Sequence, residues 1–254
     1  MKLTLAEPKY FKESVNIISE LVNEARFKLT PNGMELVVMD PASVVMVIYN
    51  LLASSFTEYD IKGKEGEKHP EFAINLATLK QVLRRIRPND MLSLEIDKDQ
   101  SKLDVVLKGS TTRSFKLPLL DLDEKEQRVP DLKFPIAIKT TPAMLNDAVE
   151  DADIVSESVT ILAEPGKFVV KAEGDLSQAL IEVPAGKDCE IDMKDQSPTK
   201  TKYSIEYLKK MVGAGKVADN LTIHFNKDYP LKLEYTTLDK VSISFILAPR
   251  VDND

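Results

Sequence analysis

A supersecondary pattern recurs four times along the chain and constrains its fold more than any other feature. Each copy reads as strand, amphipathic helix, strand, tight turn and strand, with helix starts expected near residues 9, 76, 142 and 204. The first copy is "KLTLAEPKYFKESVNIISELVNEARFKLTPNGMELVVMD". Its Pro-Asn-Gly turn supplies residues that preset or permit the backbone angles of a tight reversal. This even spacing predicts two similar domains of two units each.

The predicted fold class is α+β, with two similar domains of repeated βαββ-type units and helices on one face of antiparallel sheets. The expected limits are residues 1–117 for the first domain, 118–134 for an interdomain connector and 135–254 for the second domain. The connector "LPLLDLDEKEQRVPDLKFP" places a charged run between apolar residues, and its prolines oppose long regular structure. It is either a plain solvated linker or a surface that faces a partner.

The composition excludes several classes of protein. No run of about 18 apolar residues exists, so we expect no membrane span. The N-terminal stretch lacks the apolar core of a signal peptide. A single cysteine, Cys189, excludes an internal disulfide framework and fits a reducing cytosol. We therefore expect a soluble, cytoplasmic protein.

Motifs for catalysis and cofactor binding are scarce. His69 and His224 lie far apart and lack neighbours at metal-ligand spacing, and Cys189 has no nearby histidine, so structural roles are expected for His224 and Cys189. The segment "GAGKV" resembles a phosphate loop but lacks the first glycine and the hydroxyl residue after the lysine. No cofactor and no metal site is predicted.

The third helix is acidic. Asp147, Glu150 and Asp151 share one helical face. Such a cluster is either a solvated acidic face or the metal site of a metal-dependent hydrolase.

Three of the four helices carry basic residues, although the chain has a formal net charge of -7. In "NLATLKQVLRRIRPND" the apolar residues share one arc and the lysine and arginines share the opposite arc. Lys12 on the first helix and Lys209 and Lys210 on the fourth extend the pattern. Each arc alone is compatible with an ordinary solvated face. A shared positive face without aromatic stacking residues favours contact with phosphates, independent of base sequence.

These units, with "LVNEARFKLTPNGMELVVMDPASVVMV", "LPLLDLDEKEQRVPDL" and the ending "FILAPRVDND", resemble the sliding clamp family known as proliferating cell nuclear antigen. The resemblance covers essentially the whole chain, and "MDPASVVMV" is most similar to archaeal members. It implies the DNA clamp fold and a non-enzymatic DNA polymerase processivity factor. It further implies a closed, head-to-tail trimer around double-stranded DNA, in the cytoplasm with the nucleoid, or in the nucleus of a eukaryote.

The resemblance assigns roles to matching positions. The helices line the inner wall, which places on the DNA side Lys12, Lys80, Arg84, Arg85, Arg87, Lys209 and Lys210. Clients insert a short peptide motif into a pocket under the connector, formed by Met39, Ser43, Val44, Leu122, Gln127, Val129, Pro230, Ile246, Ala248, Pro249 and Arg250. The implied partners are a clamp loader of the replication factor C type, a DNA polymerase, a flap endonuclease and a DNA ligase.

Trimer closure in the family joins two edge strands, which here are 111–120 and 174–183. Arg113 and Lys116 on the first would face Asp175 and Glu182 on the second. Two features depart from the family pattern: the acidic third helix, and Gln127 where a larger apolar residue is common. The acidic helix leaves open one subunit of a heterotrimeric clamp, and a checkpoint-type clamp subunit is a further alternative.

Overall fold

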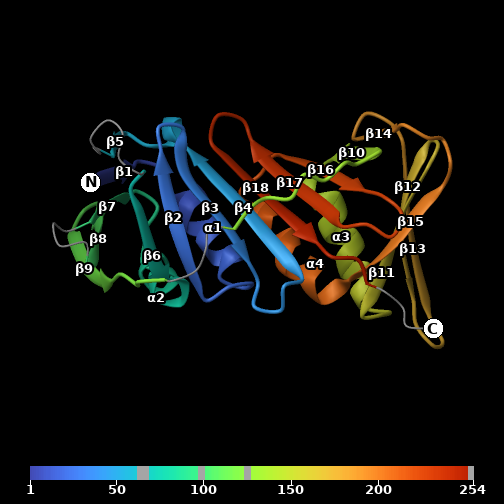
Figure 1. Ribbon diagram of the computed structural model, residues 1–254, viewed down its shortest axis with the longest axis horizontal. Helices are drawn as coiled ribbons and strands as arrows, with labels where there is room; N and C mark the ends of the chain where they lie inside the picture. Colours follow the sequence, from blue (N-terminus) through green and yellow to red (C-terminus); the bar gives the residue numbers. More distant parts are fainter. Residues whose placement is uncertain (62–68, 97–100, 123–126, 251–254) are drawn as a thin grey trace. The chain divides into compact units, whose positions relative to one another are not determined.

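A computed structural model describes residues 1–61, 69–96, 101–122 and 127–250 of the chain. The chain separates into two compact units (Figure 1). The first comprises Met1–Asp40, Val47–Val129 and Leu238–Ser242, and the second comprises Pro41–Met46, Pro130–Thr237 and Ile243–Asp254. The predicted domain limits and connector remain a prediction, and part of the connector lies outside the described residues.

The first unit contains two copies of the βαββ pattern. One copy runs through β1 (Lys2–Leu5), α1 (Lys9–Ile18), β2 (Glu24–Thr30) and β3 (Gly33–Met39). The other runs through β6 (Glu71–Asn75), α2 (Leu76–Leu83), β7 (Met91–Ile96) and β8 (Lys102–Lys108). The remaining elements are β4 (Val45–Leu52), the short 3-10 helix η1 (Ala53–Ser55), β5 (Glu58–Asp60) and β9 (Thr112–Pro118).

The second unit repeats this arrangement. Its copies are β10 (Ile136–Thr140), α3 (Pro142–Asp153), β11 (Ser158–Glu164) and β12 (Lys167–Glu173), then β15 (Thr199–Ser204), α4 (Ile205–Val212), β16 (Asn220–Phe225) and β17 (Leu231–Thr237). The remaining elements are β13 (Gln178–Pro184), β14 (Cys189–Met193), η2 (Gly213–Lys216) and β18 (Val241–Leu247). The predicted repeat is confirmed: three helices begin at the predicted residues and the fourth begins one residue later.

Within each unit the two copies exchange their first strands. In the first unit β1 pairs antiparallel with β7, and β2 pairs antiparallel with β6, giving the strand orders β5-β1-β7-β8-β9 and β4-β3-β2-β6. In the second unit β10 pairs with β16, and β15 with β11, giving β14-β10-β16-β17-β18 and β13-β12-β11-β15. Because a helix joins two strands of different sheets, neither copy can complete a sheet alone.

The helices of each unit pack in pairs against the sheets, α1 with α2 and α3 with α4 (Figure 1). The strands alternate buried and more exposed residues, which gives each sheet an apolar face for the helices. Two helices bury the same four positions, which are Leu76, Leu79, Val82 and Leu83 in α2 and Ile205, Leu208, Met211 and Val212 in α4. Burying one such side chain contributes about 1.5–3 kcal/mol.

Helix starts and hairpin turns follow from local chemistry. The Asn75 side chain caps α2 by accepting a hydrogen bond from the Thr78 backbone N–H at 3.0 Å. Gly33, at the turn between β2 and β3, and Gly166, between β11 and β12, have φ of 152° and 87°. A Cβ atom at Gly33 would lie 2.2 Å from the Leu51 carbonyl oxygen, so this turn requires glycine.

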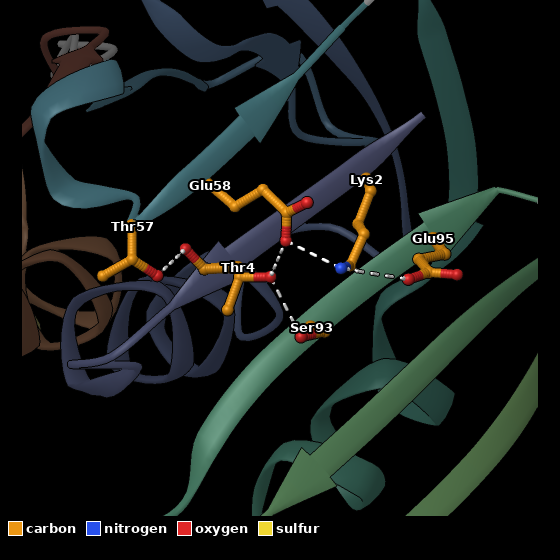
Figure 2. Close-up of polar contacts among 6 residues, drawn as sticks. All are labelled: Lys2, Thr4, Thr57, Glu58, Ser93 and Glu95. Atoms are coloured by element: carbon orange, nitrogen blue, oxygen red, sulfur yellow. Dashed lines mark hydrogen bonds and ion pairs between the residues drawn. The ribbon is translucent and has the colours of Figure 1, made fainter.

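Polar side chains fasten β5, β1 and β7 to one another (Figure 2). The Thr4 hydroxyl lies 3.2 Å from a Glu58 carboxylate oxygen and 3.0 Å from the Ser93 hydroxyl. Lys2 Nζ lies 2.8 Å from Glu58 and 4.0 Å from Glu95. Exposed ion pairs contribute little free energy, so the main consequence of these contacts is a fixed strand register. Among the described residues, no helix has the length and apolar character needed to cross a membrane.

Candidate nucleic-acid and partner interfaces

Basic residues lie on both helices of the first unit and directly after α2. Arg84, Arg85 and Arg87 follow α2 and are exposed, and Lys12 is half-buried on α1. Lys80 Nζ lies 2.5 Å from Glu20 Oε1, so a carboxylate of the same unit already compensates its charge. Arg84 and Arg85 have no carboxylate partner within the described part of the chain. These two guanidinium groups therefore carry the least compensated positive charge among the residues predicted to contact DNA.

A buried carboxylate fixes the segment that carries these arginines. Asp90 is 3% exposed and accepts a hydrogen bond from the Arg87 backbone N–H at 2.7 Å. Arg113 donates to the Asp90 carboxylate and, at 2.8 Å, to the Arg85 carbonyl oxygen. The Arg87 hydrogen bond, together with Arg113, holds the pKa of Asp90 below its usual range. A Cβ atom at Gly109 would lie 2.2 Å from the same carboxylate, so the turn after β8 must also approach it closely.

The helix pair of the second unit carries more negative charge. Asp147, Glu150 and Asp151 are exposed along α3, and α3 contains no lysine or arginine. On α4, Lys209 Nζ lies 2.5 Å from Asp153, and Lys210 Nζ lies 2.9 Å from Glu206. The predicted DNA contacts of α4 are thus lysines already paired with carboxylates of their own unit.

The residues that the sequence suggested for catalysis or metal binding lie where they serve packing rather than chemistry. Within the described ranges, no group of three or more histidine, cysteine or acidic side chains is placed to hold a metal ion. The glycine-rich segment forms η2, and a Cβ atom at Gly215 would lie 2.9 Å from Pro142 Cβ, so its small residues allow close packing against the start of α3. Burial lowers the pKa of His224, and burial raises the pKa of the Cys189 thiol.

The residues of the predicted client pocket are divided between the two units. In the second unit, the Ala248 backbone N–H donates to the Val44 carbonyl oxygen at 2.9 Å, and Ile246 on β18 is buried. Ser43 adopts φ of 57°, a conformation that non-glycine residues rarely adopt. In the first unit, Arg26 donates to the Leu122 carbonyl oxygen. Convergence of the whole set on one pocket remains a prediction.

The two strands predicted to meet at subunit boundaries both lie at sheet edges, β9 in the first unit and β13 in the second. Lys116 lies 3.6 Å from Asp104, and Glu182 lies 2.6 Å from Lys167, while Asp175 is exposed. The Arg113 guanidinium is held inside its own unit, as described above. The intersubunit roles of these four residues remain predictions.

Sequence reasoning missed two features. The pairing of Asp90 with Arg113 gave no local signal, because 23 positions separate the residues and the carboxylate lies in a loop. A cationic groove in the second unit was also missed, although Lys200 and Lys202 stand two apart on one strand and hence share a face.

Known proteins match nearly the whole chain. The model of the proliferating cell nuclear antigen N-terminal domain matches residues 1–127, and that of the C-terminal domain matches residues 128–250. A DNA polymerase sliding clamp of Nanoarchaeum equitans is 34% identical over 99% of this chain and 100% of its own length. One from Pyrococcus horikoshii is 35% identical over 96% of each chain.

Solved structures agree with these matches. The crystal structure of PCNA from Thermococcus kodakaraensis superposes with a TM-score of 0.89 at 28% identity, over 98% of this chain and 99% of that one. A chain of the PCNA2–PCNA3 complex from Sulfolobus tokodaii superposes with a TM-score of 0.87 at 26% identity, over the same shares.

Proposed function

Since this chain belongs to the proliferating cell nuclear antigen family, we propose that it is a DNA polymerase sliding clamp with the DNA clamp fold. The family consists of non-enzymatic processivity factors, which removes the hydrolase alternative for Asp147, Glu150 and Asp151. The observation that carries the proposal is the match of both family models and of a solved clamp over nearly the entire chain.

The clamp acts as a closed trimer around double-stranded DNA. The edge strands β9 and β13 support this assembly, because a head-to-tail contact between them closes a ring and leaves neither edge free to aggregate. The proposed boundary residues are Arg113, Lys116, Asp175 and Glu182. The proposed limits of the clamp domains are 1–117 and 135–254, joined by the connector 118–134.

The helix surfaces face the DNA. The proposed contacts are Lys12, Lys80, Arg84, Arg85, Arg87, Lys209 and Lys210. These side chains end in cations suited to phosphate oxygens and include no aromatic ring for base stacking. Binding is therefore independent of base sequence and weakens as salt rises.

The ring tethers enzymes through the client pocket. We assign this role to the residues that the family resemblance identified, and the proposed clients are a polymerase, a flap endonuclease and a ligase, with a loader of the replication factor C type. Apolar side chains such as Ile246 suit an aromatic or aliphatic anchor. The backbone after β18 would offer a peptide hydrogen-bond acceptors, because the N–H groups of Ala248 and Arg250 already donate within the chain. Replacing Ile246 with Ser is expected to weaken client peptides while leaving DNA encirclement intact.

A heterotrimer subunit is the second candidate. The acidic surface of α3 supports it, because sister subunits could then supply the positive charge of that sector. The PCNA2–PCNA3 complex among the structural neighbours is an assembly of different subunits. A checkpoint-type clamp subunit has the same fold and would differ in its loader and clients. We propose a cytoplasmic, nucleoid-associated location for either form.

Topological retention on DNA tests the function. The protein is loaded with a replication-factor-C-type loader on a nicked circle, washed in high salt, and the circle is then cut. A clamp is retained on the circle and lost from the linear product, whereas an ordinary DNA-binding protein is released from both by salt.

The native mass, measured beforehand, should correspond to three chains, or to three chains only when sister subunits are added. A permanent monomer, or equal retention on circles and linear DNA, would contradict the proposal.

A further inference from the structure

The start of the connector is attached to the edge of a sheet in the first unit. β6 lies at the end of the strand order β4-β3-β2-β6 (Figure 1). Leu120 forms an antiparallel bridge with Ala73 on β6, and its backbone N–H donates to the Ala73 carbonyl oxygen at 2.8 Å. The Leu119 backbone N–H donates to the Ser101 carbonyl oxygen at 3.0 Å. This part of the connector is therefore fixed to its own unit by backbone hydrogen bonds.

Arg26 holds the connector two residues further on. It lies on β2, directly across from Ala73. Its guanidinium donates to the Leu122 carbonyl oxygen, and Nη1 of the same group lies 3.5 Å from Glu71 Oε1 on β6. A hydrogen bond from a charged donor is stronger than one between neutral groups. The exposed ion pair adds little free energy, so its main consequence is to orient the guanidinium.

Arg26 shares a sheet face with a residue of the predicted client pocket. Arg26 and Lys28 alternate with buried residues along β2, so both lie on the face opposite the helices. Lys28 pairs with Glu35 on β3, and Met39 lies on the same face because it follows Glu35 by four positions. The contact between Arg26 and Leu122 therefore brings the connector to the face that also carries Met39.

We propose that Arg26 is a positioning residue for client binding, which holds the connector at Leu122 and so preforms the first unit's share of the client pocket. Met39 and Leu122 belong to that share. The inference rests on the client pocket of the proposed function and adds to it a residue that acts through the Leu122 backbone. A connector already held in the free protein leaves less ordering to be done when a client binds, and the client binds more tightly.

A positioning role differs from a purely structural one in what its loss would change. The side chains of Arg26 and Glu71 are 31% and 51% exposed, so removing their ion pair should cost the fold little stability. Loss of a positioning residue should weaken client binding at a nearly constant melting temperature. Loss of a structural residue should lower the melting temperature and leave client affinity unchanged.

Fluorescence anisotropy of the full chain tests the proposal. The probe is a labelled polar peptide with one leucine and one phenylalanine as anchors, compared with the same peptide carrying alanine at both positions. Arg26→Met keeps an apolar stem but removes every donor, and it should weaken binding of the probe at least about fivefold. Arg26→Lys keeps a charged donor, so its affinity should fall between those of the parent and Arg26→Met.

Lys108→Met is the matched control. It removes the same charge at an exposed residue on β8 of the same unit, and should weaken binding of the probe less than about twofold. Hydrogen exchange of the Leu120 backbone N–H gives a second readout without peptide. Exchange should be faster in Arg26→Met than in the parent, because release of Leu122 lets the neighbouring bridge open more often, and unchanged in Lys108→Met.

The possible failures are distinguishable. If the parent bound the probe no better than the alanine peptide, the client pocket would be refuted, and this inference with it. If the parent bound selectively but Arg26→Met bound equally well, the inference alone would be wrong. Equal weakening by Lys108→Met, or weakening that only follows a lower melting temperature, would also overturn it. Circular dichroism checks folding, and Arg26→Gln, with a shorter and neutral side chain, replaces Arg26→Met if that variant fails to fold.

Discussion

The two units share a helix-pair core but differ in the charge that they show to solvent. α2 and α4 bury the same four positions of an eight-residue helix. The lysine at the fifth position of each, Lys80 or Lys209, lies 2.5 Å from a carboxylate near the end of the preceding helix of its pair, Glu20 or Asp153. The repeat thus preserves the packing and one ion pair, while the other surface charges vary.

The two helix pairs differ strongly in their numbers of charged residues. Residues 9–18 and 76–87 of the first unit hold six lysines and arginines and one acidic residue. Residues 142–153 and 205–216 of the second hold three lysines and five acidic residues. Core packing and phosphate attraction are therefore separable in this fold, and the first unit should dominate contact with DNA.

The largest expected effect tests the shared core. Leu79→Ala in α2 and Leu208→Ala in α4 each remove a fully buried side chain at the same helical position. Each should lower the free energy of unfolding by about 3 kcal/mol, measured by chemical denaturation, because a cavity remains. If one variant lost several kcal/mol of unfolding free energy and the other lost none, the two cores would not be equivalent.

An intermediate effect should appear at Asp90, for which α4 has no buried counterpart among the described residues. Its pKa is lowered in the folded protein, so its contribution to stability is present above the ordinary pKa of an aspartate and is lost as pH falls through the lowered value. Asp90→Asn should reduce the melting temperature at neutral pH, and the difference from the parent should shrink on acidification. A difference that is constant with pH would contradict this account.

The smallest effect is expected at the exposed pair of the second unit. The side chains of Lys209 and Asp153 are 50% and 40% exposed, so Asp153→Asn should change the free energy of unfolding by less than about 1 kcal/mol. Denaturation in high salt should reduce even this difference. A loss as large as that of Leu208→Ala would show that the pair holds the helices together.

The helices and hairpins were predictable from sequence because they depend on near neighbours. Apolar periodicity located α2 at Leu76, and Pro-Asn-Gly located the turn at Gly33. The strand exchange was not predictable, because pairing β1 with β7 depends on contacts between distant segments. Helical periodicity placed Lys80 and Lys209 on basic surfaces, but it could not show that Glu20 and Asp153 would neutralise them.

The central claim is that the clamp contacts DNA chiefly through the helix surface of its first unit. The most direct measurement is the affinity of the assembled ring for double-stranded DNA across a salt series, with Arg84→Glu/Arg85→Glu compared with Lys209→Glu/Lys210→Glu. Both variants make the same change in charge. The arginine variant should weaken binding at least about tenfold. It should also reduce the slope of log affinity against log salt by about 0.9 for each phosphate that it no longer neutralises. The lysine variant should weaken binding less than about threefold. Equal weakening by the two variants, or greater weakening by the lysine variant, would contradict the claim.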